Sequence, residues 1–223
     1  EQSFTNPSSE WVEGVYVFPL PEDSAVDRLT MHIGNRIIEG QIKEKEEARK
    51  IYQAAKKAGK KASLIEQQRP NIFTASIANI PPGESISIAI EYQQSVLIDN
   101  KKFSIRFPMI VSDRYVPGKE IATSSDALGL APNTHRVPDA SKVTPPSDPN
   151  VDRPISININ LKAGFKTDTI ESTYHNISIV DVDEKHKHIA LNKRTELQRD
   201  FELVWAPIAN LQPELAVFTQ KKD

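Results

Sequence analysis

Runs of alternating apolar and polar residues dominate the first half of the chain and predict β-strands. Residues 11–18 have apolar side chains on both sides of the alternation and stop at Pro19 and Pro21, which cannot donate hydrogen bonds to a sheet ladder. We therefore expect a strand that is buried on both faces. In the run that follows, Gly34 and Asn35 tolerate the positive φ of a tight turn and predict a hairpin.

The same alternation returns further along and predicts the rest of an antiparallel sheet. Pro70 and Asn71 favour a turn between two strands, and Asp99 and Asn100 favour another. The strands expected around these turns cover residues 73–77, 86–92 and 103–107. The pattern thus predicts a mainly β fold, with an antiparallel, sandwich-like domain over residues 1–115.

One segment of this domain replaces the alternation with a helical period. Between Lys43 and Lys61 the apolar residues have the spacing of one helical face, at Ala48, Ile51, Tyr52, Ala55 and Ala58. Glutamates occupy the first turn and lysines the last, as the helix dipole favours, and Gly59 can end the helix in a left-handed conformation. We expect one inserted amphipathic helix, with Ile51 and Tyr52 buried against the sheet.

The composition and the apolar periodicity of the sequence change after Phe107. Half of the 16 prolines fall between Pro108 and Pro154, and the apolar residues between them follow no sustained period. Loops of this length usually act as linkers or carry a function. We interpret residues 116–153 as a Pro-rich linker or strap, and a binding loop is the alternative.

A second block of alternating residues covers positions 154–223. Ile155, Ile157, Ile159 and Leu161 alternate with polar residues, which is typical of a strand buried on one face. Further short runs follow at residues 169–174, 176–180, 188–191, 201–205 and 215–218. We expect a second, smaller β-sandwich-like domain.

Composition narrows the functional classes without naming one. The 28 lysines and arginines are balanced by 30 acidic residues, for a net charge of −2, whereas dedicated nucleic-acid-binding domains usually carry a positive excess. The absence of cysteine excludes disulfides, thiol catalysis and cysteine metal sites. None of the common hydrolase, metalloprotease or phosphate-loop motifs occurs. We expect neither an enzyme nor a cofactor.

One cluster of residues resembles a metal site. The candidate ligands lie in a predicted turn: Asp181, Asp183, Glu184, His186 and His188. Their spacing fits zinc or calcium only loosely, and polar turns often contain the same residue types. Because Lys185 and Lys187 lie between them and repel cations, we expect no metal to bind here.

Three segments of the first domain carry a resemblance to a known family. They are FPLP at residues 18–21, EKEEAR at 44–49 and EQQRPNIFT at 66–74. In this order they resemble the VIT domain, named for the vault protein and the inter-alpha-trypsin inhibitor heavy chains, over residues 4–115. The sequence looks most like the bacterial branch, in which this domain precedes a von Willebrand factor A domain in exported proteins. Some of those proteins are described as sortase targets of marine proteobacteria.

The resemblance implies a function in adhesion at the cell surface. The family assigns no established catalytic role to the three segments, and the DxSxS metal-adhesion motif of the A domain is absent from this chain. We therefore expect an extracellular, non-enzymatic module. It would position an adjacent A domain of the same polypeptide and bind protein partners but no nucleic acid. Contact with a membrane or cell wall would require anchoring segments outside these residues.

The candidate interaction surface combines the basic end of the predicted helix with the turn after the next strand. Its residues are Lys56, Lys57, Lys60, Lys61, Arg69 and Asn71. The alternative is that this basic end binds a polyanion or a nucleotide in an intracellular module. The shortage of aromatic residues for base stacking argues against that alternative, and helix-dipole compensation explains the lysines without a ligand.

Overall fold

The computed structural model describes residues 1–109, 116–121, 131–144, 154–192 and 199–209. The chain divides into two compact units, and each combines segments that are distant in sequence. The first unit comprises residues 1–94 and 111–148, and the second comprises residues 95–110 and 149–223. Both are built from antiparallel sheets, so the mainly β fold class is confirmed. No helix among the described residues is long and apolar enough to span a membrane.

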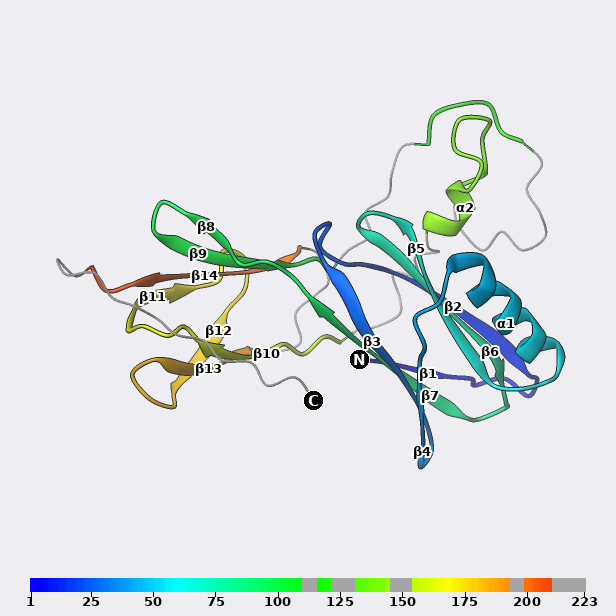
Figure 1. Ribbon diagram of the computed structural model, residues 1–223, viewed down its shortest axis with the longest axis horizontal. Coiled ribbons are helices and arrows are strands. Elements are labelled where there is room, and N and C mark those ends of the chain that lie inside the picture. Colours follow the sequence, from blue (N-terminus) through cyan, green and yellow to red (C-terminus); the bar gives the residue numbers. More distant parts are fainter. Residues whose placement is uncertain (110–115, 122–130, 145–153, 193–198, 210–223) are drawn as a thin grey trace. The chain divides into compact units, whose positions relative to one another are not determined.

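Two sheets form the first unit (Figure 1). The four-stranded sheet has the order β1 (Gln2–Thr5), β7 (Ser85–Gln93), β3 (Ala25–Ile33) and β4 (Arg36–Glu39). The three-stranded sheet has the order β2 (Val12–Pro19), β6 (Ile72–Ile80) and β5 (Ala62–Arg69). Residues from both sheets share one apolar cluster, which includes Met31 and Ile86 from one and Ile77 from the other. The unit is therefore a small sandwich, because this cluster joins the two sheets.

The predicted strand at residues 11–18 forms, but the prediction that both of its faces are buried is wrong. Phe18 is buried, whereas 59% of Trp11 and 39% of Val15 are exposed. Trp11, Glu13 and Val15 share one face of the strand, and on that face α1 contacts Glu13 while the other two side chains stay exposed. Burial on both faces belongs instead to the central strand β6, where Ile72, Phe73, Thr74 and Ala75 are all buried in succession.

The predicted helix is α1 (Lys45–Lys57), and both of its ends are capped. At the start, the Glu44 carboxylate accepts hydrogen bonds from the backbone N–H groups of Glu46 and Glu47. At the end, Gly59 has a φ of +66°, as predicted, and the N–H groups of Gly59 and Lys60 bind carbonyls of the last turn. The two ends of the helix are thus set by local interactions whose residues can be recognised in the sequence.

A residue of the sheet completes the C-terminal cap of α1. Asn79 in β6 has a φ of +57°, which is unusual for a residue other than glycine. Its side-chain amide donates to the carbonyl oxygens of Lys56 at 3.1 Å and Lys60 at 2.8 Å. The bent backbone of the strand therefore points a hydrogen-bond donor at the helix end and fastens α1 to the sheet.

Only part of the apolar face predicted for α1 contacts the sheet. Tyr52 is buried as expected, but 53% of Ile51 is exposed, so the prediction that Ile51 is buried is wrong. Ala54 and Ala58 beside it are exposed too. The apolar arc of the helix is wider than its contact with the sheet, and the spacing alone does not say which edge of the arc faces the protein.

Part of the predicted linker packs against the first unit. Residues 131–144 include a single helical turn, α2 (Ala140–Val143), in which Ala140 and Val143 are buried. The Arg69 guanidinium at the end of β5 donates two hydrogen bonds to the Asp139 carboxylate, at 2.8 and 2.6 Å. These residues are packed structure rather than a free strap. Residues 110–115, 122–130 and 145–153 lie outside the described part of the chain.

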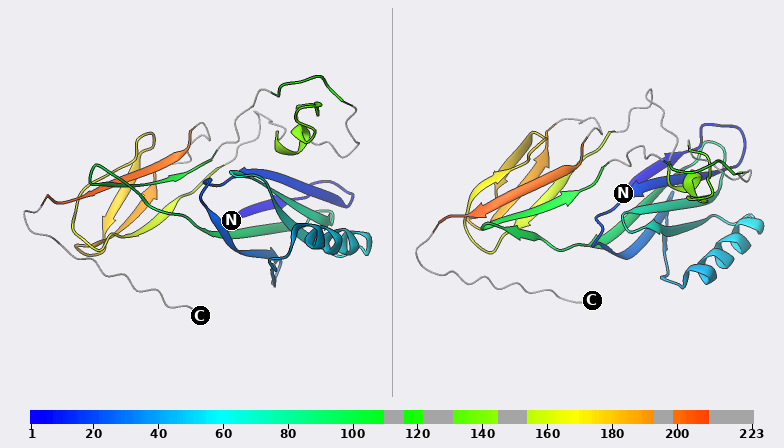
Figure 2. Two further views of the ribbon diagram at one scale, coloured as in Figure 1. Left: turned by 45° about the horizontal axis from the view of Figure 1, so that its top comes forward. Right: turned by 90° about the horizontal axis from the view of Figure 1, so that it is seen from above.

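The second unit is also a sandwich of two sheets (Figure 2). One has the order β10 (Asn158–Lys162), β13 (His186–Leu191) and β12 (Ile177–Asp181). The other has the order β11 (Thr167–Glu171), β14 (Phe201–Pro207), β9 (Lys102–Phe107) and β8 (Leu97–Asp99). Leu161, Ile189 and Leu203 are buried in the core between the sheets. The strand predicted at residues 215–218 lies outside the described residues.

The hairpin β8–β9 belongs to the second unit, which corrects its predicted place in the first sheet. Its turn forms where expected, with positive φ at Asn100 and Lys101. However, β9 pairs with β14, so that Phe103 lies opposite Trp205 and Phe107 opposite Phe201. Alternation predicted the strand but contains no information about its partner. The boundary between the units thus falls at residue 94 rather than at residue 115.

Candidate interaction surface

The six predicted surface residues do not form one patch. Lys56, Lys57, Lys60 and Lys61 lie at the end of α1 and just before β5, whereas Arg69 and Asn71 lie at the far end of β5. Eight residues of extended strand separate the two groups, a distance of about 25 Å. Sequence proximity suggested one surface, but the straight strand places its two ends apart.

Lys56 belongs to a partly buried group of polar side chains that joins α1 to the sheet. Its Nζ lies 2.5 Å from Oε2 of Glu13 on β2, and the Tyr52 hydroxyl donates to Oε1 of the same carboxylate at 2.6 Å. Partial burial raises the pKa of Glu13, but the hydrogen bonds from Lys56 and Tyr52 outweigh it and leave that pKa below its usual value. Burial, followed by the hydrogen bond to Glu13, raises the pKa of Tyr52. The cluster fastens α1 to β2.

Two more of the predicted residues are used in ion pairs within the unit. Lys61 Nζ lies 2.5 Å from Oε2 of Glu84, and Arg69 makes the double contact with Asp139 described above. Asn71 accepts a backbone hydrogen bond from Leu20 through its carbonyl. Of the five cations among the six residues, only Lys57 and Lys60 have side chains without a partner among the described residues.

The segments that carried the family resemblance are also structural. Phe18 and Leu20 of FPLP lie in a buried apolar cluster of the first unit. Arg49 of EKEEAR donates from Nε to Oε1 of Glu66 in EQQRPNIFT at 2.6 Å, and from Nη1 to Glu46 at 2.9 Å. Each of these segments therefore positions α1 on the sheet or fills the core.

The exposed side of α1 carries a group of residues that sequence analysis missed. We call it the α1 flank, and its members are Lys50, Ile51, Ala54, Lys57 and Ala58. All five are exposed, and their spacing places them along one side of the helix, away from buried Tyr52. The sequence did contain a signal for this group, because the apolar residues of the helix span an arc too wide to be covered by one contact with the sheet.

The predicted metal candidates do not converge. Among the residues that the structure describes, no group of three or more histidine and acidic side chains could hold a metal ion. The Asp181 carboxylate pairs with Lys187 Nζ at 3.0 Å, and His188 Nδ1 lies 3.1 Å from Oδ1 of Asn160. The Asp183 carboxylate accepts from the backbone N–H of Lys185. These neighbours give the cluster a local structural role.

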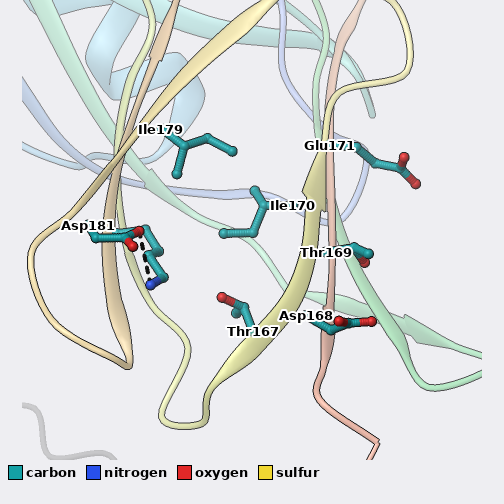
Figure 3. A pocket seen from close by; sticks show the side chains of 8 residues that line it. Thr167, Asp168, Thr169, Ile170, Glu171, Ile179 and Asp181 are labelled. Atoms are coloured by element: carbon teal, nitrogen blue, oxygen red, sulfur yellow. Dashed lines mark ion pairs between the residues drawn. The ribbon is translucent and has the colours of Figure 1, made fainter.

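An open depression of about 460 Å³ lies between the edge strands β11 and β12 of the second unit (Figure 3). Ile170 and Ile179 point toward one another across it, and Thr167 and Asp181 line its lower part. The Asp181 carboxylate is already paired with Lys187. The depression therefore lies at the open edge of a sandwich, and one of its three lining acids is used in an ion pair.

Comparison with known families finds similarity in the first part of the chain. Residues 1–92 match the family model described as the vault protein inter-alpha-trypsin domain. The mouse protein mono-ADP-ribosyltransferase PARP4 is 42% identical over 91 residues, which are 41% of this chain and 5% of that protein. A von Willebrand factor A domain-containing protein of Dictyostelium discoideum is 37% identical over 87 residues, 39% of this chain and 10% of that protein.

A further relative aligns with nearly the whole chain. The mouse von Willebrand factor A domain-containing protein 5A is 22% identical over 210 residues, which are 91% of this chain. The chain spans 24% of that protein, and a smaller share of the other two. The described alignment therefore includes residues of both units.

Proposed function

We propose that the chain is a non-enzymatic interaction module that positions a neighbouring von Willebrand factor A domain, and the match of residues 1–92 to the VIT family model supports this proposal. The observation that carries this proposal is the 210-residue alignment with a protein named for its A domain. That alignment includes both sandwich units, not the VIT domain alone. An arrangement in which both units accompany an A domain is the simplest reading of that match.

The geometry of the described residues supports a binding role rather than catalysis. Two ion pairs of the first unit have structural roles, because Lys56–Glu13 fastens α1 to the sheet and Arg69–Asp139 fastens residues 131–144 to it. The match to PARP4 covers only 5% of that protein, so its transferase activity gives no reason to assign one here. Function must be argued from the site rather than from the fold, and the most distinctive site is an exposed surface.

We extend the proposal to an exported, cell-surface protein of the bacterial sortase-target branch. Its support is the sequence resemblance of the FPLP, EKEEAR and EQQRPNIFT segments, and its setting would be extracellular adhesion. The full-length gene product provides the test. We expect a secretory leader before these residues, an A-type domain after them and a sorting signal at the end. A gene product that has the A-type domain but neither a leader nor a sorting signal would overturn this extension while leaving the positioning role intact.

The positioning role is tested in the full-length polypeptide by hydrogen exchange. We expect amides on one face of the A domain to exchange more slowly in the full-length protein than in the isolated A domain. The reason is that contact with the module excludes water from that face and suppresses local opening. Identical exchange in both proteins would show that the two sandwiches only occupy space beside the A domain.

The polyanion-binding alternative keeps less support. Three of its five helix-end and turn cations, Lys56, Lys61 and Arg69, are neutralised by acids of the same unit. Lys57 and Lys60 remain, with Lys50 one turn earlier, and none of the three has an acidic partner among the described residues. So few cations predict only weak binding to a labelled polyanion, and that binding should disappear as salt is raised.

A further inference from the structure

The α1 flank combines an exposed apolar residue with unpaired positive charge. Ile51 is 53% exposed in the middle of the helix, and the small residues Ala54 and Ala58 follow it at helical spacing. Together these side chains form a narrow apolar strip that faces solvent rather than the core.

The charges around Ile51 are not balanced within the unit. The side-chain amines of Lys50, Lys57 and Lys60 have no ion-pair or hydrogen-bond partner among the residues that the structure describes. The nearest acids on the helix are already engaged, because Glu46 pairs with Arg49 at 2.9 Å and Glu47 with Lys43 at 3.3 Å. The flank thus offers an apolar centre with a net positive border.

We propose that the α1 flank docks an acidic amphipathic helix of a protein partner. The inference rests on the proposed function as an interaction module and names the kind of partner. Ala54 and Ala58 allow a second helix to approach closely, and Ile51 can pack between its apolar side chains. Aspartate or glutamate beside those apolar residues would pair with Lys50 and Lys57.

The chemistry of the flank favours this occupant over a second copy of the chain. A second copy would bring the same unpaired lysines to the contact, where like charges repel. A bare polyanion would pair with the lysines but leave Ile51 in water.

The helix is held ready for such a contact. On its other side, Tyr52 and Lys56 bind Glu13, Arg49 binds Glu66, and Asn79 caps the last turn. A partner therefore meets a surface that is already ordered, so less conformational entropy is lost on binding.

The test uses the full chain and a labelled synthetic peptide of about 18 residues, five helical turns. The peptide has leucine at the apolar heptad positions and glutamate beside them. One control peptide has lysine in place of each glutamate, and another has serine in place of each leucine. Fluorescence anisotropy should show binding of the acidic peptide and at least about tenfold weaker binding of both controls.

Variants of the chain locate the contact. Ile51→Gln keeps a good helix former and should weaken binding of the acidic peptide about tenfold, and Lys57→Glu should weaken it several-fold. The matched control is Ile37→Gln, an equally apolar and 65% exposed residue on β4, which should bind as wild type does. Circular dichroism of each variant checks that the unit remains folded.

Three results would overturn the proposal. They are unchanged binding by Ile51→Gln, equal binding of the glutamate and lysine peptides, or dimerisation of the chain that Ile51→Gln abolishes. The last would assign the flank to a second copy. Hydrogen exchange of the A domain in full-length Ile51→Gln separates this inference from the positioning role. If Ile51→Gln loses peptide binding but its A-domain amides stay protected, the A domain contacts another surface. If the peptide binds but no A-domain amides are protected, only the positioning role is removed.

Discussion

Asn79 offers a sharp test of how α1 is fastened to the sheet, because one residue combines two separable effects. Its φ of +57° is easily adopted by glycine but costs an ordinary residue about 1 kcal/mol or more. Its amide also satisfies the carbonyls of Lys56 and Lys60 at the end of the helix. Substitution by glycine removes the hydrogen bonds alone, and substitution by alanine removes them and adds backbone strain.

The magnitudes follow from these two effects. Two hydrogen bonds to a partly solvated helix end contribute about 0.5 to 1.5 kcal/mol each, so we expect Asn79→Gly to lower the free energy of unfolding by about 1 to 3 kcal/mol. Asn79→Ala should lower it by about 1 kcal/mol more, because alanine is strained at this φ. The order glycine above alanine reverses the usual ranking of these residues inside regular structure.

Urea titration followed at the helical band of the circular dichroism spectrum is the assay, since α1 is the longest helix described. Asn100→Ala is the matched control, because Asn100 also has a positive φ, of +47°, but lies in the β8–β9 turn of the second unit. It should leave the helical signal of the first unit unchanged. Equal stability of Asn79→Gly and Asn79→Ala would refute the strain argument, and wild-type stability of both would refute the capping argument as well.

Three further predictions concern burial, docking and pH. Tyr52→Ala should lower the free energy of unfolding by about 3 kcal/mol or more, whereas Ile51→Ala should change it by less than about 1 kcal/mol, as urea titrations will show. Arg69→Ala should detach residues 131–144, so limited proteolysis should cut there first while the wild type resists. Burial lowers the pKa of His175 from 6.5, so protonation favours the unfolded state. The free energy of unfolding should therefore fall as the pH drops below about 6.5. His175→Leu should flatten this pH dependence, which urea midpoints measured across the range will show.

Local features of the fold were predictable because they depend on neighbouring residues. The turn at Gly34 and the helix end at Gly59 both have positive φ, and both were expected from residue type alone. The arrangement of alternating residues likewise predicted that β9 exists. Its pairing with β14 could not be predicted, since nothing near Phe103 indicates that Trp205 will lie opposite.

The candidate site was less predictable because charge pairing depends on the tertiary structure. Lys56, Lys61 and Arg69 looked available in the sequence, yet each meets an acid that is distant in sequence: Glu13, Glu84 and Asp139. Conversely, the apolar spacing predicted burial of both Tyr52 and Ile51, and only Tyr52 is buried. A helical period identifies an apolar arc, but the width of the contacting sheet decides how much of that arc is covered.

The chain enters the second unit at residue 95, returns to the first at residue 111 and leaves it again at residue 149. Neither unit is therefore a contiguous stretch of the gene. On the ribosome, β9 is synthesised long before β14, since Arg106 and its ion-pair partner Asp200 are 94 residues apart. Until β14 emerges, the apolar face of β9 has no sheet to join, and closing so long a loop slows folding. A single proteolytic nick in one crossing would leave the two units covalently joined through the other two.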